Sequence, residues 1–274
     1  MTPWITKPVP FNIGQGAAAA GGGTPAIDDT GLVALYKFDE SSMSVPNSSE
    51  SSDSGGTDFD ATATGATTDV TGHIDGTTCF SFDGVDDNIA LYDDSDLAKS
   101  IWNFLHDGTT WSCSYWIRRI TIDAYVRLWD QLYDGGGTLG NGATAYFFDA
   151  SIAPFGDGNF MITNNTAQRV LDATFSSAFW NDTDWHFYTH TWNITPASNN
   201  LVSTIDNATT VNANKSAFTP SANNALANMT GMSNVGGGNW NNAEIQQLTF
   251  WNVVIDQDVQ DALWNDGDGR AFYT

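Results

Sequence analysis

The chain has 274 residues, and its nine basic and 32 acidic side chains give a formal net charge of −23 at pH 7. Such a charge repels phosphate groups, so the sequence disfavours nucleic acid and an anionic membrane surface as partners. Hydrophobic residues make up 41% of the chain and aromatic residues 13%, which is enough for a sizeable core. No apolar run approaches the roughly 20 residues that a membrane-spanning helix needs, and the first residues lack the apolar stretch of a secretory signal.

Residues 1–30 differ in composition from the rest of the chain. Prolines alternate with apolar residues at first, and the run GQGAAAAGGG follows at residues 14–23. Proline keeps the first part extended, while the Gly/Ala run forms a flexible tether. The pattern predicts an arm that docks on another protein, or else an arm that folds back on its own domain or is disordered. The predicted anchor residues are Trp4, Ile5, Val9, Phe11 and Ile13.

Residues 31–274 read as one β domain, because short apolar runs alternate with turn-forming Gly, Asp, Asn and Ser. Their lengths and spacing predict an antiparallel two-sheet sandwich. Residues 41–65 are rich in Ser, Asp and Gly and are expected to form a loop, and Asp206-Asn207 is expected to turn a hairpin. Strands are expected within residues 31–40, 78–84, 88–93, 111–120, 125–132, 143–150, 159–164, 168–174, 185–194, 201–206, 208–212 and 244–254.

Two short helices are also expected. Ser95 can cap a helix that begins at Asp96 and that Gly108 stops. Asp256 can cap a second helix, which Gly267 would end. The fold class predicted is therefore all-β, with two short helices and an extended N-terminal arm.

Six segments follow one another in a characteristic order: GLVALYKFDE, FSFDGVDDNIAL, WSCSYWIRRI, DWHFYTHTWN, LVSTIDN and EIQQLTFWNVVIDQDVQDALWNDGDGR. This order resembles the laminin-G-like, pentraxin-like branch of the concanavalin A-like jelly rolls, over about residues 31–270. Two departures are Asp206-Asn207, where the family usually shows Asp-Gly, and Tyr188 and His190, where it usually has small apolar residues. Residues 121–180, which usually carry ligand specificity in the family, match only as generic strands, so the fold transfers more safely than the function.

Catalysis is not expected from the carboxylates or from a nucleophile. The related jelly-roll glucanases carry Glu-x-Asp-x-x-Glu on one strand, whereas Glu40, Glu50 and Glu244 are isolated here. The chain has no Gly-x-Ser-x-Gly motif, and Cys79 and Cys113 lie in apolar strand-like segments.

The spacing of the histidines does not favour a catalytic or metal centre either. His186 and His190 share a strand face, but four residues of strand separate them by roughly 13 Å, too far for one metal ion. HFYTH could supply the His and Tyr of a polyuronate lyase, but the domain lacks the basic residues that would neutralise the substrate's carboxylate. The sequence therefore predicts that the chain is not an enzyme.

Aromatic side chains are the candidates for binding sugars. In WHFYTHTW, His186, Tyr188 and His190 share one strand face, which could be an exposed platform for sugar rings. The alternative is that these and the other aromatic residues pack in the core and at its rim. The candidates are Trp129, Tyr133, Tyr146, His186, Tyr188, His190 and Trp240.

The corner FDGVDD offers oxygen donors of the kind that Ca²⁺ prefers, from Asp83, Asp86 and Asp87. Asp39, which ends the first predicted strand, could approach them in space. The resemblance makes a Ca²⁺ site plausible, since many members of the family use this ion. The alternative is a plain turn in which Asp83-Gly84 permits a positive φ and the other acids bond to the backbone.

These features together favour a lectin-like surface module of a phage or virus particle, displayed on a capsid or tail through residues 1–30. The expected partners are other structural proteins of that particle and cell-surface glycans, with a homo-oligomer as a further option. Many weak contacts would then add up to useful adhesion. Two alternatives stay open: a free carbohydrate-binding or polysaccharide-active protein, and a purely structural particle component.

Overall fold

The fold was examined in a computed structural model, which describes residues 27–48, 60–91, 102, 104–107, 109–121, 125–130, 142–148, 160–163, 169–171, 183–213, 229–233 and 240–272. The five predicted anchor residues, Tyr133 and Ser95 lie outside the described residues. None of the helices in the described part of the chain is both long and apolar enough to cross a membrane.

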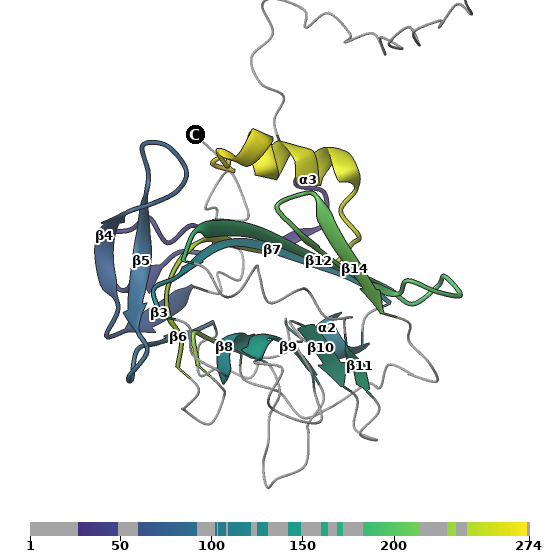
Figure 1. Cartoon of the computed structure of the whole chain (residues 1–274), viewed down its shortest axis with the longest axis horizontal. Helices are drawn as coiled ribbons and strands as arrows, with labels where there is room; N and C mark the ends of the chain where they lie inside the picture. Colours follow the sequence, from purple (N-terminus) through teal and green to yellow (C-terminus); the bar gives the residue numbers. More distant parts are fainter. Residues whose placement is uncertain are drawn as a thin grey trace, which may run out of the picture.

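Two antiparallel sheets stack face to face, as predicted (Figure 1). Sheet A has the order β14-β13-β12-β7-β16-β5-β4, and β1 also pairs with β16; sheet B has the order β11-β10-β9-β8-β15-β6-β3-β2. The strands of sheet A are β1 (Leu32–Tyr36), β4 (Thr67–Thr71), β5 (Thr78–Asp83), β7 (Thr110–Arg119), β12 (Trp185–Asn193), β13 (Leu201–Ile205), β14 (Thr209–Ala213) and β16 (Asn242–Trp251). The strands of sheet B are β2 (Ser44–Val45), β3 (Ala61–Thr64), β6 (Asn88–Ala90), β8 (Tyr125–Asp130), β9 (Gly142–Phe148), β10 (Phe160–Thr163), β11 (Arg169–Leu171) and β15 (Thr230–Gly231).

The main core lies between the two sheets and is rich in aromatic rings. Phe250 of β16 is fully buried there, and its ring meets Trp102 and Trp129 edge-on, with centroids 5.0 and 5.2 Å apart. Edge-to-face packing of this kind adds to the burial of the rings themselves. The strand alternation of β7 sends Trp111, Cys113, Tyr115 and Ile117 into this core.

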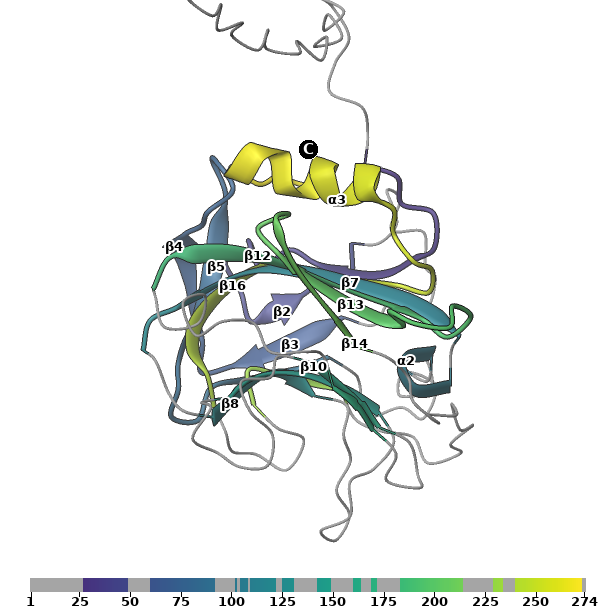
Figure 2. The same cartoon turned by 45° about the vertical axis from the view of Figure 1, so that its right-hand side comes forward.

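A second core lies on the outer face of sheet A, beneath helix α3 (Gln257–Trp264; Figure 2). The ring of Trp116 stacks on that of Trp264, with centroids 5.4 Å apart and planes 9° apart, and Phe187 packs against both. Leu263 of the helix is fully buried in the same cluster. Both faces of sheet A are therefore covered over much of its area.

The predicted start of α3 is confirmed, and its predicted end is displaced. Asp256 is the N-cap, and its Oδ1 accepts the Val259 N–H at 3.0 Å. The α-helix stops at Trp264 because Asn265 adopts a left-handed conformation with φ 48°, and a 3₁₀ turn, Asn265–Gly267, follows. Of the other predicted helix, the structure describes only α2 (Phe104–Asp107).

The hairpin at Asp206-Asn207 is also confirmed. Both residues have φ 51°, which Asp and Asn tolerate better than most side chains, and they join β13 to β14. Positive φ at both central positions matches the twist of paired strands.

The loop expected at residues 41–65 is wrong in part, because β2 and β3 lie within it. In β3, the sequence ATAT buries both alanines and exposes both threonines. This small-residue alternation is the period of a strand, but two alanines make a weak apolar signal. Pairing with β6 stabilises β3 as a strand, although its own sequence carries only a weak apolar signal.

Cys79 and Cys113 are free and buried. Phe80 and Phe82 of β5 point into the core between the sheets. Cys79 directly precedes Phe80 and therefore points to the outer face of sheet A, because neighbouring residues of a strand face opposite sides. Cys113 points into the core between the sheets. Burial raises the pKa of Cys79 to about 12, which keeps its thiol protonated and unreactive at neutral pH.

Candidate functional site

The platform predicted on β12 faces the interior. Tyr188 and His190 are 1% and 0% exposed, and both lie on the face of β12 that points at sheet B. The prediction that they form an exposed surface is wrong, because strand alternation sends these even-numbered side chains into the core between the sheets. They are polar residues in a buried setting, so they need polar partners.

His190 has those partners on both sides. Its Nε2 lies 2.8 Å from the Tyr115 hydroxyl of β7, and its Nδ1 lies 2.7 Å from Ser203 Oγ of β13. Burial lowers the pKa of His190 to about 3, so the imidazole is neutral at physiological pH. Its role is to link three strands inside the sandwich.

His186 lies nearer the surface, with a side chain 14% exposed. Its Nδ1 is 2.7 Å from Asp206 Oδ2, and Asp206 Oδ1 accepts the Phe187 N–H at 3.0 Å. The Asp206 carboxylate thus links the β13–β14 hairpin to the first residues of β12. This geometry accounts for His186 as a structural residue.

The remaining aromatic candidates are scattered. Trp129 is fully buried against Phe250, so its predicted place on the surface is wrong. Trp240 is half-buried just before β16, and Tyr146 lies on β9, where the structure describes only the backbone. The structure does not bring these residues together with the β12 stripe in one described surface.

The acidic corner connects β5 in sheet A to β6 in sheet B. Asp83 Oδ1 accepts the Val85 N–H and Asp87 Oδ2 accepts the Asp83 N–H, both at 2.8 Å. Gly84 has φ +76°, and a Cβ there would lie 2.8 Å from the Cβ of Asn242, so the turn requires glycine. The bonds within the corner explain the motif as a turn between sheets.

The same corner keeps oxygens close enough to share a cation. One ligand atom each from Asp83, Asp86 and Asp87 lies within 4.8 Å of the others. Ca²⁺ binds oxygens at 2.3–2.6 Å, so oxygens around one ion lie at most about 5 Å apart. The three carboxylates fit part of such a shell, in which Ca²⁺ takes six to eight oxygens.

Asp39 does not belong to this group, which corrects the prediction that it approaches. Its carbonyl accepts the hydroxyl of Thr78 at 3.0 Å, and Thr78 begins the strand that Asp83 ends. A strand rises about 3.4 Å per residue, so the two ends of this six-residue strand are about 17 Å apart. Asp39 and Asp83 therefore lie at opposite ends of β5, which the sequence alone does not show.

A row of mainly polar residues crosses the part of the outer face of sheet A that α3 does not cover. Five residues stand directly opposite one another on five adjacent strands, and we call them the cross-strand row. Its members, from β4 through β5, β16 and β7 to β12, are Thr67, Ser81, Glu244, Arg118 and Trp185. Since strands lie about 4.8 Å apart, the row is about 19 Å long.

The centre of the row is an ion pair laid against an indole. Arg118 Nη2 lies 2.6 Å from Glu244 Oε2, and the guanidinium carbon lies 5.6 Å from the centroid of the Trp185 ring. The Arg118 side chain is 39% exposed and that of Glu244 is 6% exposed. Hydrogen bonding to Glu244 raises the pKa of Arg118, so the guanidinium stays charged.

His73 borders the row on the side of α3. Its ring lies 4.1 Å from that of Trp116 and 5.8 Å from that of Trp185, measured between centroids. Its Nε2 is 2.7 Å from the Gly267 carbonyl, which follows α3. The row therefore combines a half-buried indole, a fixed guanidinium and two hydroxyl-bearing residues on one solvent-facing surface.

The row is not visible in the sequence because its members come from five separate segments. In the sequence, Trp185 alternates with His186, Tyr188 and His190 and so lies on the opposite face of its strand, and Glu244 is an isolated carboxylate. Alternation within WIRRI and AEIQQ places Arg118 and Glu244 on the outer face, but their register is a tertiary property.

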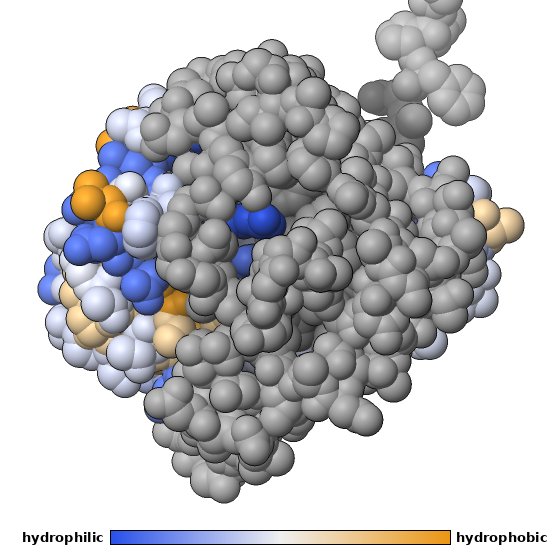
Figure 3. All heavy atoms as spheres, turned by 90° about the horizontal axis from the view of Figure 1, so that it is seen from below, coloured by the Kyte–Doolittle hydropathy of each residue, from blue (hydrophilic) through white to orange (hydrophobic). Residues whose placement is uncertain are grey.

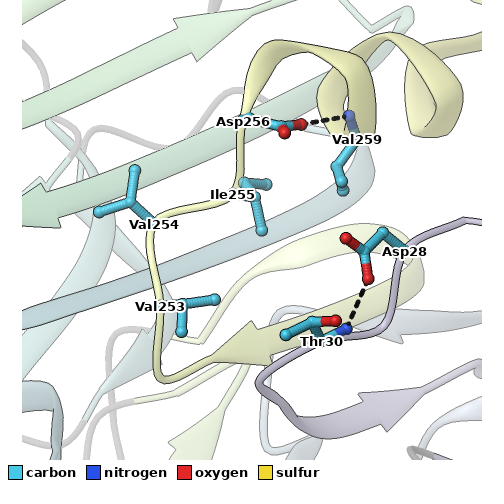
Figure 4. A pocket seen from close by; sticks show the side chains of 7 residues that line it. All are labelled: Asp28, Thr30, Val253, Val254, Ile255, Asp256 and Val259. Carbon is cyan, nitrogen blue, oxygen red and sulfur yellow. Dashed lines mark hydrogen bonds between the residues drawn. The ribbon is translucent and has the colours of Figure 1, made fainter.

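A cavity of about 250 Å³ lies beside the start of α3 (Figure 4). Its carboxylates are engaged locally: Asp28 Oδ1 accepts the Thr30 N–H at 3.0 Å, and Asp256 caps the helix. The other lining is mainly aliphatic, so the cavity offers less polar recognition than the row. It is lined by Asp28, Thr30, Val253, Val254, Ile255, Asp256 and Val259.

Apolar side chains are otherwise isolated on the described surface. The large exposed ones are Val85, Ile120 and Val254, at 65%, 42% and 39%. Seen from the side of sheet B, the described residues are mostly hydrophilic, with separate hydrophobic spheres (Figure 3). Single exposed apolar residues of this kind need no partner to explain them.

No model of a known protein family matches this chain, and no curated protein sequence matches it. Solved structures do share its fold. Trypanosoma rangeli sialidase in complex with 2,3-difluorosialic acid gives a TM-score of 0.57 at 11% identity, over 93% of this chain and 36% of the sialidase.

Two toxin-related binding domains are similar as well. The binding domain of botulinum neurotoxin DC in complex with SialylT gives a TM-score of 0.55 at 11% identity. The binding domain of Paraclostridial Mosquitocidal Protein 1 gives 0.59 at 14% identity, and each alignment covers 86% of this chain and 52% of the other. The chain thus spans about a third of the sialidase and about half of these domains, and identities this low show a shared fold alone.

These comparisons overturn the prediction that the chain is not an enzyme. The similar structures include a sialidase, which is an enzyme, beside domains described as binding domains. The fold is therefore compatible with either class, and the absence of known catalytic motifs from the sequence does not decide between them.

One carboxyl in the described structure has the acidity of a general acid. Burial, with a smaller contribution from the neighbouring Asp39 charge, raises the pKa of Glu40 to about 7. Its buried Oε2 has no hydrogen-bond partner among the described residues. A carboxyl that titrates near neutral pH suits proton transfer, although a strained structural carboxyl shows the same shift.

The Ca²⁺ prediction for the corner can be checked by thermal unfolding. We expect millimolar Ca²⁺ to raise the Tm of the wild-type chain, because an ion bound only by the folded state stabilises it. Asp86→Asn should reduce this rise, whereas Asp69→Asn, an exposed acid outside the corner, should not. Equal Tm with and without Ca²⁺ in the wild type would leave the corner as a turn only.

Glu40 should make stability depend on pH. Its folded pKa is raised above the ordinary value of 4.5, so its protonated form favours folding. The contribution is complete below about pH 4.5 and is lost as pH rises through about 7. In urea unfolding between pH 4.5 and 8, the wild type should therefore lose stability relative to Glu40→Gln; parallel curves would contradict the shift.

Proposed function

We propose that this chain is a carbohydrate-binding module, and the observation that carries the proposal is the cross-strand row. An indole offers an apolar face for a sugar ring, and a fixed Arg–carboxylate pair offers directed hydrogen bonds. Ser81 and Thr67 add hydroxyls that can donate or accept. Binding sites of this type join apolar contact with a few fixed polar groups.

The comparisons support this proposal at the level of the fold. Sandwiches of this shape occur in a sialidase and in binding domains, one of them in complex with a sialyl ligand. The resemblance of the sequence to lectin-like jelly rolls of the laminin-G-like branch points in the same direction. What the row adds is a set of residues in this chain that can make the contacts.

Trp185 gives the sharpest test. We expect Trp185→Ala to weaken binding on a glycan array by at least about tenfold, since a central aromatic contact commonly contributes about 2 kcal/mol. Trp185→Phe should retain part of the affinity because it keeps a flat ring. Val254→Ala removes exposed apolar atoms at the cavity beside α3 and should leave binding unchanged.

Two outcomes would contradict this role for the row. One is a wild-type chain that binds no glycan on the array. The other is a Trp185→Ala chain that keeps full binding, with circular dichroism showing the same fold as the wild type.

We also propose that the module is displayed on a larger particle, a phage or viral capsid or tail, through residues 1–30. Many copies on one particle would turn weak single-site binding into strong adhesion. The motivation is the sequence of this arm, with apolar residues among prolines ahead of a Gly/Ala tether. In this setting, a purely structural role is the second candidate, and glycan binding separates the two.

Removing residues 1–23 tests the attachment. The shortened chain should bind glycans as the full chain does but should no longer co-purify with the particle. Replacing Trp4, Phe11 and Ile13 by Ser should have the same effect without shortening the chain. Co-purification of both variants at the level of the full chain would show that the attachment lies elsewhere.

A further inference from the structure

We infer that the cross-strand row selects neutral sugars and disfavours sialylated ones, an inference that rests on the proposed carbohydrate binding. The ligand class follows from the charge of the row and of its neighbours. It differs from the sialyl ligand of one similar binding domain, with which this chain shares only the fold.

Arg118 is the basic member of the row, and Glu244 already balances its positive charge. Its Nη2 lies 2.6 Å from Glu244 Oε2, and the Glu244 side chain is only 6% exposed. A sialic acid carboxylate bound at Arg118 would have to share the single guanidinium charge with the buried Glu244 carboxylate, which leaves one negative charge uncompensated and is unfavourable. The guanidinium therefore offers hydrogen-bond donors to a ligand but no uncompensated positive charge.

The charges around the row are acidic and come from separate elements. Asp83 stands opposite Asn242, two residues along β16 from Glu244, and a two-residue step is about 6.8 Å. Asp184 directly precedes Trp185 and is exposed. A ligand carboxylate on this side of the row would meet the like charge of Asp83.

The turn after α3 adds further acids on the side of the row that His73 borders. Asp266 and Asp268 are exposed and flank Gly267, whose carbonyl is bonded to His73 beside Trp185. The chain's net charge of −23 reinforces the effect at longer range. Like charges brought together at a binding site are a common means of rejecting a competing ligand.

Neutral hydroxyls meet none of these penalties. Arg118 has five N–H donors, and its side chain is 39% exposed, so donors remain for sugar oxygens after the bond to Glu244. Ser81 and Thr67 can donate to or accept from hydroxyls further along the row. At about 19 Å, the row is long enough for more than one ring of an oligosaccharide.

The test is a glycan array of matched pairs that share one core, such as lactose and 3′-sialyllactose, together with neutral glucans and mannans, probed with the full chain. We expect neutral members to bind at least tenfold more tightly than their sialylated partners. The preference should narrow at high salt, which screens the acidic surroundings.

Glu244→Gln identifies the origin of the preference. It keeps the shape and a hydrogen-bonding oxygen for Arg118 but removes the compensating charge, so sialylated partners should gain at least tenfold relative to neutral ones. Asp258→Asn makes the same charge change on an exposed position of α3, outside the row, and should leave the ratio as in the wild type.

Each outcome decides a different point. Wild-type binding of sialylated members as tight as or tighter than neutral ones overturns the selectivity and leaves carbohydrate binding standing. A Glu244→Gln ratio equal to that of the wild type, with the fold intact by circular dichroism, overturns the role of the ion pair. No binding to any glycan overturns the proposed function and the selectivity with it.

Discussion

Sheet A buries most of both of its faces, and this constraint governs where the polar side chains of its described strands can go. Its inner face packs on sheet B around Phe250 and Trp111, and its outer face packs on α3 through Trp116, Phe187 and Trp251. A polar residue on these strands must therefore find a partner inside the protein or lie beyond the edge of α3. His190 follows the first course, and Arg118 follows the second.

The same constraint explains which parts of the structure the sequence could predict. The N-cap at Asp256 and the hairpin at Asp206-Asn207 depend on residues within a few positions of each other, so local chemistry is enough to find them. The two-sheet sandwich follows from the density of short strands and turns. The short strand β3 was missed because alanines supply too little apolar signal without the partner strand β6.

The candidate site was out of reach for the opposite reason. His186, Tyr188 and His190 look like a surface stripe in sequence, because buried histidine and tyrosine are unusual on a strand that lines a core. Tyr115 on β7 and Ser203 on β13 bond to His190 and make its burial tolerable. Both stand beside His190 only after the strands pair. Residues from five strands build the row in the same way, so neither feature exists at the level of one segment.

Because the fold is shared at 11–14% identity by a sialidase and by binding domains, the sandwich itself specifies no ligand. Specificity must come from the few side chains that the two cores leave free. In the row, Glu244 performs two tasks that can be separated: it holds Arg118 against Trp185, and it cancels the guanidinium charge. A glutamine at this position would keep the first and lose the second, so the ligand charge that the surface accepts can change while the fold stays the same. Under the proposed function, a scaffold buried over most of both faces keeps its strands fixed, and one ion pair on the uncovered part of sheet A sets the charge of the ligand.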